Sequence, residues 1–297
     1  MKTTRWALLL VLVLGLFAAA CGDDEEEPAG GSGAEPAADV EEFPAETTMG
    51  RIQEAGEIKI GVKYDVPPFG FKNPQTDDIE GFDVDLGQAI ADKLGVEPNF
   101  VEAISDNRIP FLADGTVDLV LSTMTINAER DQEIDFSEPY YIAQGRILVP
   151  QDSDIAGIDD LAGNRVCTAL GSTYEATLKE QAPDADLRLV DSYSECLELV
   201  QNGAVDAVST DDVILTGMII QDDTLKLTEG EPLTTEPYGA GIKDGDTEFQ
   251  EFVNGVIEEY KSGGGWAEAY EKWVGQYTGE QQEPPTMTLE EAIEVTS

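Results

Sequence analysis

The segment Asp118–Arg130, DLVLSTMTINAER, places hydrogen-bond donors directly after an apolar run. The apolar residues end at Leu121 and are followed by hydroxyl side chains, by Asn127 as an expected helix N-cap, and by Arg130 on the first turn. We therefore expect a strand whose carboxyl end opens into a helix start, where loop N–H groups, hydroxyls and a guanidinium converge. A planar bidentate donor beside amides at a positive helix end is what holding a carboxylate requires.

The composition argues against several classes of function. Among 297 residues there are 61 acidic and 17 basic side chains and no histidine, which gives a formal net charge of −44. So negative a surface repels phosphate groups, which argues against nucleic-acid binding. Without histidine the chain lacks the commonest metal ligand and general base, and we expect neither a metal nor a cofactor. An anion could still be held where basic side chains gather in a cleft, because near fields outweigh screened distant ones.

The N-terminal residues predict an exported protein. Residues 1–20 have a basic start, a short apolar core and small residues before Cys21, which is the pattern of a signal peptide. The core is shorter than a helix that spans a bilayer. The run Ala18-Ala19-Ala20-Cys21 resembles a bacterial lipoprotein box, with Ala18 where leucine is usual. We expect lipid attachment at Cys21 and anchoring to the outer face of the cell membrane; the alternative is ordinary signal cleavage, with Cys21 incidental.

Residues 21–50 are rich in glycine, proline, alanine and acidic residues and offer few side chains to bury. We expect a disordered acidic tether there, which lifts a folded domain off the membrane. Since one acyl chain binds a membrane only marginally, stable attachment would need the several chains that a lipoprotein carries.

Two further cysteines, Cys167 and Cys196, lie in the part expected to fold. Outside the cell such a pair usually forms a disulfide, which is the expectation here, with two buried thiols as the alternative. A redox-catalytic role is not expected, because the C-x-x-C spacing is missing.

From about Arg51 the sequence becomes regular. Residues Glu57–Tyr64 alternate apolar and polar side chains, which predicts a strand. Apolar residues recur every fourth position from Phe82 to Leu94, which predicts a helix that Gly95 ends. The other elements expected in this run are strands over 96–102, 117–121 and 142–149, a short helix over 108–113 and a helical turn over 127–132.

The alternation of strands and helices restarts at Arg165. We expect strands over 165–169, 187–190, 204–210 and 238–242, helices over 172–181, 194–202, 211–220, 246–261 and 266–274, and one helical turn after Thr288. Two such runs joined by two extended segments predict an α/β protein of two lobes, each a sheet flanked by helices, with a cleft between them. The expected first lobe comprises 51–144 and 243–275, the second 145–242, and an acidic tail 276–297 follows. Ligands of such sheets bind at the carboxyl ends of strands.

Four motifs together resemble the bacterial extracellular solute-binding proteins of family 3, which bind polar amino acids as lipoproteins of ABC importers. They are GFDVDLGQAIADKL at 81–94, PPFGF at 67–71, the segment 106–141 and AVDAVSTDD at 204–212. The resemblance covers about Ile58 to Val274 and is greatest for the glutamate/aspartate-binding branch. It implies a two-lobed periplasmic-binding-protein-like fold of type II with two hinge strands.

The resemblance implies which residues would bind the α-carboxylate of the ligand. Arg130 would hold it bidentately, with backbone and hydroxyl bonds from Thr123 and Thr125. Ser172 and Thr173 open a helix in the second lobe and would donate N–H groups from the opposite side. The alternatives are that Arg130 pairs with a neighbouring glutamate at the surface, that the threonines are turn residues, and that Ser172 only caps its helix.

Three further residues complete the implied contacts to the amino acid. Asp211 would accept bonds from the ammonium group, although it could instead be a helix N-cap, and Asp212 competes for the assignment. Phe69 would form a wall of the cleft, with a place in the core as the alternative. Tyr193 would reach the ligand from the second lobe.

The choice of ligand is expected to depend on Arg108, Ser105 and Lys63. In the glutamate/aspartate branch a basic residue in an Asn-Arg pair contacts the side-chain carboxylate, and Asn107-Arg108 matches it. Lys63 stands where that branch has another basic residue, and as a lysine it lacks bidentate geometry. The alternative is that Arg108 only closes its helix start and that Lys63 is solvated.

The implied function is that of a monomeric receptor without chemistry of its own. It would close around L-glutamate or L-aspartate and deliver it to the permease of an ABC-type importer. A neutral ligand such as glutamine is the nearest alternative. Rival classes are a dehydratase or peptidoglycan lyase on the same fold, which would need an acid or base in the cleft, and a sensor domain that signals to a membrane kinase.

Overall fold

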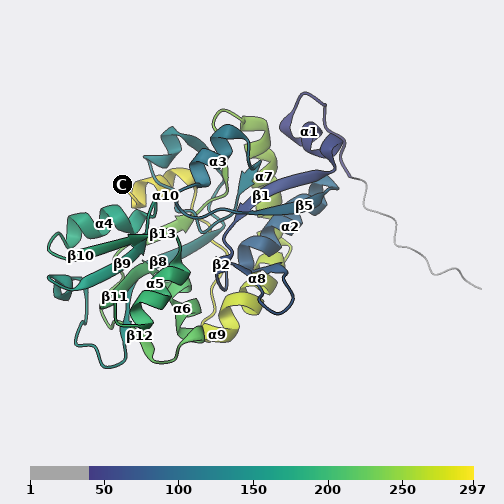
Figure 1. Ribbon diagram of the computed structural model, residues 1–297. Coiled ribbons are helices and arrows are strands. Elements are labelled where there is room, and N and C mark those ends of the chain that lie inside the picture. The colour runs from purple at the N-terminus through teal and green to yellow at the C-terminus, as the bar shows by residue number, and fades with distance from the viewer. Residues whose placement is uncertain (1–39) are drawn as a thin grey trace, which may run out of the picture. The chain divides into compact units, whose positions relative to one another are not determined.

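The computed structural model describes residues 40–297, drawn in colour in Figure 1. The expected signal peptide, the lipid attachment at Cys21 and most of the expected tether lie outside the described residues. Within residues 40–297, none of the helices has the length and apolar character needed to span a bilayer.

The first sheet is five-stranded and carries helices formed from both ends of the domain. Its strand order is β5 (Glu97–Glu102), β1 (Glu57–Val62), β6 (Leu119–Val120), β14 (Gly241–Lys243) and β7 (Ile134–Phe136). β1 runs parallel to β5 and β6, whereas β14 is antiparallel to β6 and β7. Its helices are α2 (Phe82–Leu94), α3 (Arg108–Asp114), α7 (Thr247–Ser262) and α8 (Gly265–Tyr270).

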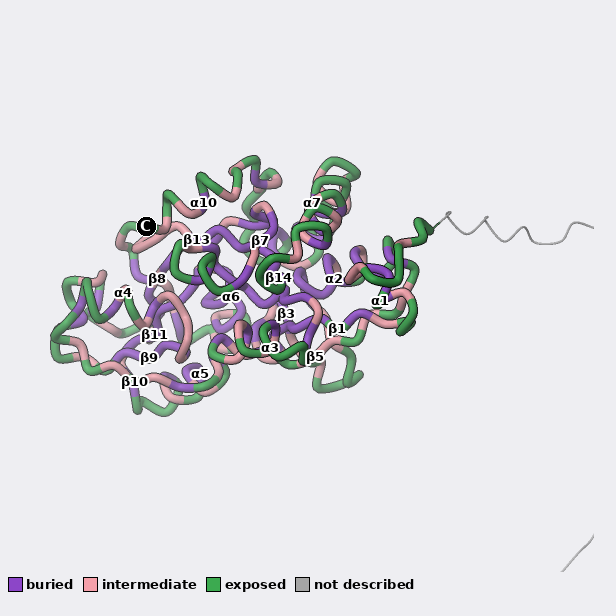
Figure 2. The backbone as a smooth tube through the Cα atoms, turned by 90° about the horizontal axis from the view of Figure 1, so that it is seen from above, coloured by how far each residue is buried: buried purple, intermediate pink, exposed green. Residues whose placement is uncertain are grey.

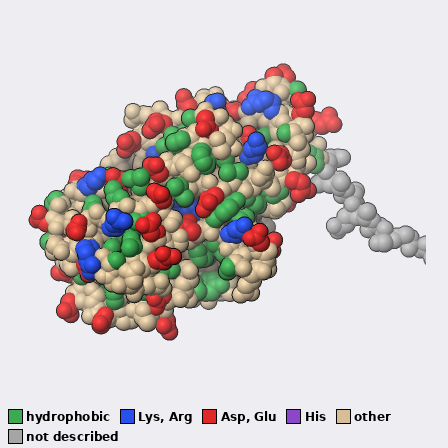
Figure 3. All heavy atoms as spheres, in the orientation of Figure 1, with side chains coloured by type: hydrophobic (Ala, Val, Ile, Leu, Met, Phe, Trp, Pro, Cys, Tyr) green, Lys and Arg blue, Asp and Glu red, His purple; other side chains and the backbone are tan. Residues whose placement is uncertain are grey.

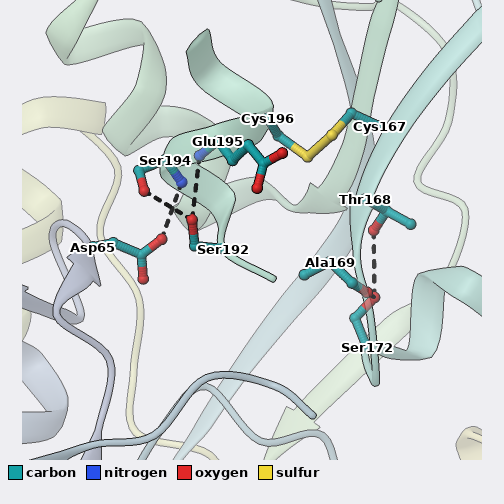
Figure 4. Close-up of a disulfide and its surroundings, with 9 residues drawn as sticks. All are labelled: Asp65, Cys167, Thr168, Ala169, Ser172, Ser192, Ser194, Glu195 and Cys196. Atoms are coloured by element: carbon teal, nitrogen blue, oxygen red, sulfur yellow. Dashed lines mark hydrogen bonds between the residues drawn. A yellow bond between two sulfur atoms is a disulfide. The ribbon is translucent and has the colours of Figure 1, made fainter. Parts of the chain in front are cut away.

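The second sheet is built around β8 (Tyr141–Pro150) and has the order β10 (Asp186–Val190), β9 (Arg165–Ala169), β11 (Ala207–Asp211), β8 and β12 (Leu225–Leu227). Its helices are α4 (Thr173–Gln181), α5 (Tyr193–Gln201) and α6 (Asp212–Gln221), with a short 3₁₀ helix over Ile158–Leu161. A disulfide between Cys167 and Cys196 fastens β9 to α5, as expected from the sequence (Figure 4).

Two antiparallel strands connect the sheets. The first half of β8 pairs with β13 (Thr235–Tyr238), and its second half pairs with β11 and β12 in the second sheet. After β13 the chain returns to the first sheet as β14. A small sheet of β2 (Asp65–Val66), β3 (Gly70–Lys72) and β4 (Ile79–Glu80) precedes α2. Mixed sheets joined by two extended segments confirm the expected α/β fold of type II.

An aromatic cluster forms part of the core beside the connecting strands. Phe69 is fully buried, with its ring 4.8 Å from that of Tyr141 and 5.2 Å from that of Phe82, measured between centroids. Trp266 packs on the same cluster, and its indole N–H donates to the Tyr140 carbonyl at 2.7 Å. Buried backbone is concentrated in the strands of both sheets (Figure 2). Phe69 is thus packed among the aromatic side chains of the core. Its expected role as a wall of the cleft stays a prediction.

The end of the expected tether packs on the folded domain. Helix α1 (Thr48–Ala55) starts within it, and Met49 is buried. The ring of Phe43 meets that of Phe252 edge-on, with centroids 5.4 Å apart. Besides these apolar contacts, the N–H of Phe43 donates to Gln53 Oε1 at 3.0 Å, so a stretch whose composition predicts a tether is docked on the domain.

The C-terminal segment is also packed rather than a free acidic tail. After a short π-helix over Glu271–Gly275 and the short α9 (Gln276–Thr278), helix α10 (Leu289–Val295) forms where a turn after Thr288 was expected. Thr288 and Glu291 make a reciprocal capping box. Ala292 is fully buried in a cluster that includes Met124, Ile126 and Phe136.

Three local predictions of secondary structure need correction. The strand expected over 238–242 is two strands, β13 and β14, because the chain changes sheet between them. The strand expected over 117–121 is only the two residues of β6. The helical turn expected over 127–132 is a single 3₁₀ turn, Arg130–Gln132, too short to provide a helix dipole.

Candidate ligand-binding site

Arg130 is buried at the carboxyl end of the first sheet, in the 3₁₀ turn that follows the hydroxyl-rich loop. Its backbone N–H is capped by Asn127 Oδ1 at 2.9 Å. In the side chain, Nη1 donates to the Thr125 carbonyl at 2.7 Å and Nη2 to the Gly171 carbonyl at 3.1 Å. Among the described residues no ion pair joins Arg130 to a neighbouring glutamate. The guanidinium therefore points across to the second sheet rather than along the surface.

Arg108 is the first residue of α3 and converges on the same place. Its guanidinium donates to the carbonyls of Ser105 at 3.1 Å, Ser122 at 2.9 Å and Thr123 at 3.1 Å. Nη2 is 3.4 Å from the carbonyl of Gly171, the group that also accepts from Arg130. Burial lowers the pKa of Arg108, and the positive charge of Arg130 lowers it further. Two guanidinium groups thus share one uncharged acceptor.

Gly171 makes this convergence possible. Its φ of 72° is in the left-handed region, and a Cβ there would lie 2.6 Å from Asp106 Cα. Only glycine allows the loop before α4 to approach the start of α3 so closely.

Lys63 adds a third buried cation at the end of β1. Its Nζ donates to Ser105 Oγ at 2.9 Å and lies 5.9 Å from the ring centroid of Tyr193. Burial lowers the pKa of Lys63 to about 7, and the charge of Arg108 contributes in the same direction. None of the ion pairs found in residues 40–297 includes Lys63, Arg108 or Arg130. Buried cations without an anion are costly, so this cluster favours a bound anion.

The loop between β6 and Arg130 is held by an acid that the sequence analysis did not select. Thr123 has a φ of 44°, and its N–H donates to Asp83 Oδ2 at 2.9 Å. Asp83 is fully buried and also accepts from the Tyr140 hydroxyl at 2.8 Å. Burial raises the pKa of Asp83 to about 7. The available signal was the position of an acid on the first turn of α2, next to the apolar residues Phe82 and Val84.

The second sheet contributes residues at the starts of α4 and α6. Ser172 is the N-cap of α4, but its hydroxyl donates to the Ala169 carbonyl at 2.7 Å. Asp211 is the N-cap of α6 and accepts from the Tyr174 hydroxyl at 2.7 Å. Burial raises the pKa of Asp211 to about 8, and the negative charge of Glu236 contributes. A cationic group next to Asp211 would favour its charged form, so this buried acid is suited to an ammonium group.

Three further predicted residues, Tyr193, Thr125 and Thr173, also belong to the buried site. Tyr193 is buried at the start of α5, and burial raises its pKa to about 12. The hydroxyls of Thr125 and Thr173 both donate to Glu236, a second acid that sequence reasoning missed. Of the predicted site residues, the ones that the structure brings together are Lys63, Ser105, Arg108, Thr123, Thr125, Arg130, Ser172, Thr173, Tyr193 and Asp211, whereas Phe69 lies in the aromatic core.

The two sides of the site are in contact. Asp65, from the small sheet beside the first sheet, accepts a 3.0 Å bond from the N–H of Ser194 at the start of α5 (Figure 4). A Cβ on Gly217 of α6 would collide with the Pro67 carbonyl. A cavity of about 460 Å³ opens at the edge of the site beside Arg130, Ser172 and Thr173; Glu129 and Glu133 also line it, whereas Lys63, Arg108 and Asp211 do not. The arrangement is that of a site closed between two sheets.

The surface has the opposite character to the site. On the face shown in Figure 3, acidic side chains are spread widely and basic ones are few. Three of the 17 basic residues of the whole chain are buried together in the site, on a molecule of net charge −44. The arrangement can bind an anionic group through the cations and a cationic group through Asp211.

Comparison with known proteins gives a consistent result. Residues 58–276 match the model of the bacterial extracellular solute-binding proteins, family 3. The glutamine-binding protein of an ABC transporter from Bacillus subtilis is 38% identical over 231 residues, which are 76% of this chain and 84% of the relative. The glutamate-binding protein of Corynebacterium efficiens is 32% identical, covering 91% of this chain and 88% of the relative.

A solved structure agrees with these relatives. An ancestral arginine-binding protein bound to glutamine superposes with a TM-score of 0.71 at 37% identity, covering 74% of this chain and 98% of the other. These three relatives are named as binding proteins rather than as enzymes.

Proposed function

We propose that this chain, which belongs to the bacterial extracellular solute-binding proteins of family 3, binds L-glutamate or L-aspartate as its ligand. The family makes it an exported amino-acid-binding receptor of ABC transport. What the proposal adds is the acidic side chain of the ligand, the role of each site residue, and lipid anchoring through Cys21.

The observation that carries the proposal is the buried cluster of Lys63, Arg108 and Arg130 without an ion-pair partner. Buried acids nearby favour the charged forms of Lys63 and Arg130, but within residues 40–297 none forms an ion pair with them: Asp83 accepts from an N–H and a phenol, and Glu236 from two hydroxyls. A ligand with two carboxylates and one ammonium group would supply the missing negative charge.

The geometry supports a separate set of contacts for each charged group of the ligand. Arg130 would bind the α-carboxylate, with N–H groups at the start of α4 on its other side. Asp211 would accept from the ammonium group. Arg108 and Lys63, with Ser105 between them, would bind the side-chain carboxylate. The two carboxylates of the ligand would then contact residues of the first sheet, and its ammonium group would contact the second. Because the ligand makes all of these contacts only when the two sides are together, its binding favours the closed form.

The relatives are named for glutamine as well as for glutamate, so the charge of this site has to decide between them. Glutamine would satisfy Arg130 and Asp211 equally well. It would leave Lys63 and Arg108 buried without an anion, at a cost of several kcal/mol. The acidic amino acid is therefore the better ligand for these residues.

Calorimetric titration of the purified protein with L-glutamate, L-aspartate, L-glutamine and L-arginine tests the proposal. We expect heat with an acidic amino acid and a micromolar Kd, which corresponds to about −8 kcal/mol. Tighter binding of glutamine, or no heat with either acid, would reject the acidic ligand. Turnover of an aromatic precursor, or cleavage of peptidoglycan, would instead identify a dehydratase or lyase on the same fold.

Lipid anchoring is tested separately in cells. Metabolic labelling with a fatty acid should mark the protein and should be lost in Cys21→Ser. Label that persists in this variant would place the lipid elsewhere.

A further inference from the structure

Glu236 lies on one of the two strands that connect the sheets. It is a residue of β13 and is paired with Ala143 of β8. β13 also touches the ligand-binding loop, because the N–H of Ile126 donates to the Pro237 carbonyl at 2.8 Å. Glu236 therefore sits where the connection between the sheets meets the loop that leads to Arg130.

The carboxylate of Glu236 accepts a hydrogen bond from one hydroxyl on each side of the site. Its side chain is 2% exposed, and Oε2 accepts from Thr125 Oγ1 at 2.5 Å and from Thr173 Oγ1 at 3.1 Å. Thr125 belongs to the loop after β6 of the first sheet, whereas Thr173 is the first residue of α4 on the second. A single carboxylate oxygen thus links the two sides.

The negative charge of Glu236 also favours the charged form of Arg130, although Glu236 forms no direct bond to the guanidinium. Burial lowers the pKa of Arg130, and among the nearby charges Glu236 opposes this most strongly. No ion pair joins the two residues in the described part of the chain. The connection runs through Thr125, whose hydroxyl donates to Glu236 and whose carbonyl accepts from Arg130. The guanidinium keeps donors for a ligand carboxylate.

We propose that Glu236 is a positioning residue that couples closure of the site to ligand binding. While the two sides are together it holds the hydroxyls of Thr125 and Thr173, and on opening it loses the bond from Thr173. The hydroxyl protons of both threonines are used in this way, so their N–H groups rather than their hydroxyls would face the ligand. The inference rests on the proposed ligand site and adds a residue outside it.

A bond made only in the closed form slows release of the ligand more than it speeds capture. Glu236→Gln preserves the shape but removes the charge, so the two hydroxyls are left with a neutral amide oxygen, which is a weaker acceptor than a carboxylate. We expect stopped-flow fluorescence to show L-glutamate dissociating about tenfold faster, the effect of one charged hydrogen bond, with little change in the association rate. Thr173→Val should act similarly, and the double variant should be no worse than either single one.

Glu198→Gln provides the matched control, since Glu198 is an exposed acid on helix α5, on the same side as Thr173. It should leave both rates unchanged. Dissociation at the wild-type rate in Glu236→Gln and Thr173→Val, or additive effects in the double variant, would overturn the proposal. If Glu236→Gln fails to fold, the dissociation rate of Thr173→Val decides by itself, because this substitution alters only the bond from the second side.

A measurement without ligand separates this proposal from the identity of the ligand. Nitroxides at Asp92→Cys on α2 and Glu180→Cys on α4, with Cys21→Ser, report the distance between the two sides. Glu236→Gln should shift the ligand-free distribution toward longer distances. If wild-type protein does not bind L-glutamate, the proposed ligand fails while this shift still decides the role of Glu236; an unchanged distribution would refute it.

Discussion

At the scale of single residues, the site is defined by buried cations that form no ion pair within residues 40–297. Lys63 is 2% exposed, donates to one serine hydroxyl and faces an aromatic ring. Its burial lowers its pKa to about 7, so it is poised to lose its proton unless an anion arrives. Asp211 is the corresponding acid on the other side. A zwitterion with an extra carboxylate would satisfy all of these groups.

Replacing Lys63 should change which amino acid the protein prefers. Lys63→Met keeps the length of the side chain but removes the charge that would pair with the ligand side chain. We expect the Kd for L-glutamate to rise by about 100-fold, while that for L-glutamine changes little. Titration calorimetry measures both.

Lys59→Met is the control, because Lys59 lies on the same strand β1 with its side chain exposed. It should leave both affinities at the wild-type values. Equal losses for glutamate and glutamine in Lys63→Met would show that Lys63 supports the fold rather than the choice of ligand.

The raised pKa of Asp211 predicts how stability without ligand varies with pH. Burial raises this pKa from 3.8 to about 8, so the folded state keeps a proton that the unfolded state releases at lower pH. The stability linked to that proton is complete below pH 4 and is lost as pH rises toward 8. Melting temperatures of the wild type should therefore fall more steeply across this window than those of Asp211→Asn. Parallel curves would contradict the assignment.

At the scale of elements, the end of a helix could be predicted from the sequence where a single residue determines it. Helix α2 ends at Leu94, as the four-residue spacing and Gly95 indicate, because Gly95 adopts a left-handed conformation and caps the carbonyls of Ala91 and Asp92. The C-terminal segment was less predictable. Its sequence is mostly acidic and polar, and the apolar face of α10 around Ala292 is short. That this face packs on Met124, Ile126 and Phe136 is seen only in the fold.

Asp83 and Glu236 were not predicted as site residues, because their contacts too are formed only in the folded chain. The partners of Asp83 and Glu236 lie far away in the chain: Thr123 and Tyr140 for the first, Thr125 and Thr173 for the second. The place of Asp83 on the first turn of α2 was its only local signal, and Glu236 belongs to no pattern that distinguishes it from the many acidic residues of this chain. Arginine was informative because it is rare here.

Packing of helix α10 should contribute measurably to stability. Ala292→Asp would place a carboxylate in the cluster formed by Leu112, Met124 and Phe136, where Ala292 is fully buried. We expect the free energy of unfolding to fall by about 3 kcal/mol, or α10 to detach. Denaturant titration measures the loss. The exposed Glu294→Gln on the same helix should have almost no effect, and an equally small effect of Ala292→Asp would show that α10 does not pack as described.

At the scale of the whole molecule, the distribution of charge separates the surface from the site. A net charge of −44 keeps the surface strongly negative, yet three basic side chains are buried between the sheets. Ionic screening reduces the influence of surface charges beyond a Debye length of about 8 Å at physiological salt, while the buried groups act at hydrogen-bond distance. An anionic ligand can therefore bind to an acidic protein, provided that the two sides close around it.

A crystal structure of the protein grown with L-glutamate tests this account most directly. We predict the ligand between the two sheets, with its α-carboxylate on Arg130, its ammonium group on Asp211 and its side-chain carboxylate on Arg108 and Lys63. An empty site with the Arg130 guanidinium turned to solvent, or a ligand whose side chain avoids Arg108 and Lys63, would contradict it.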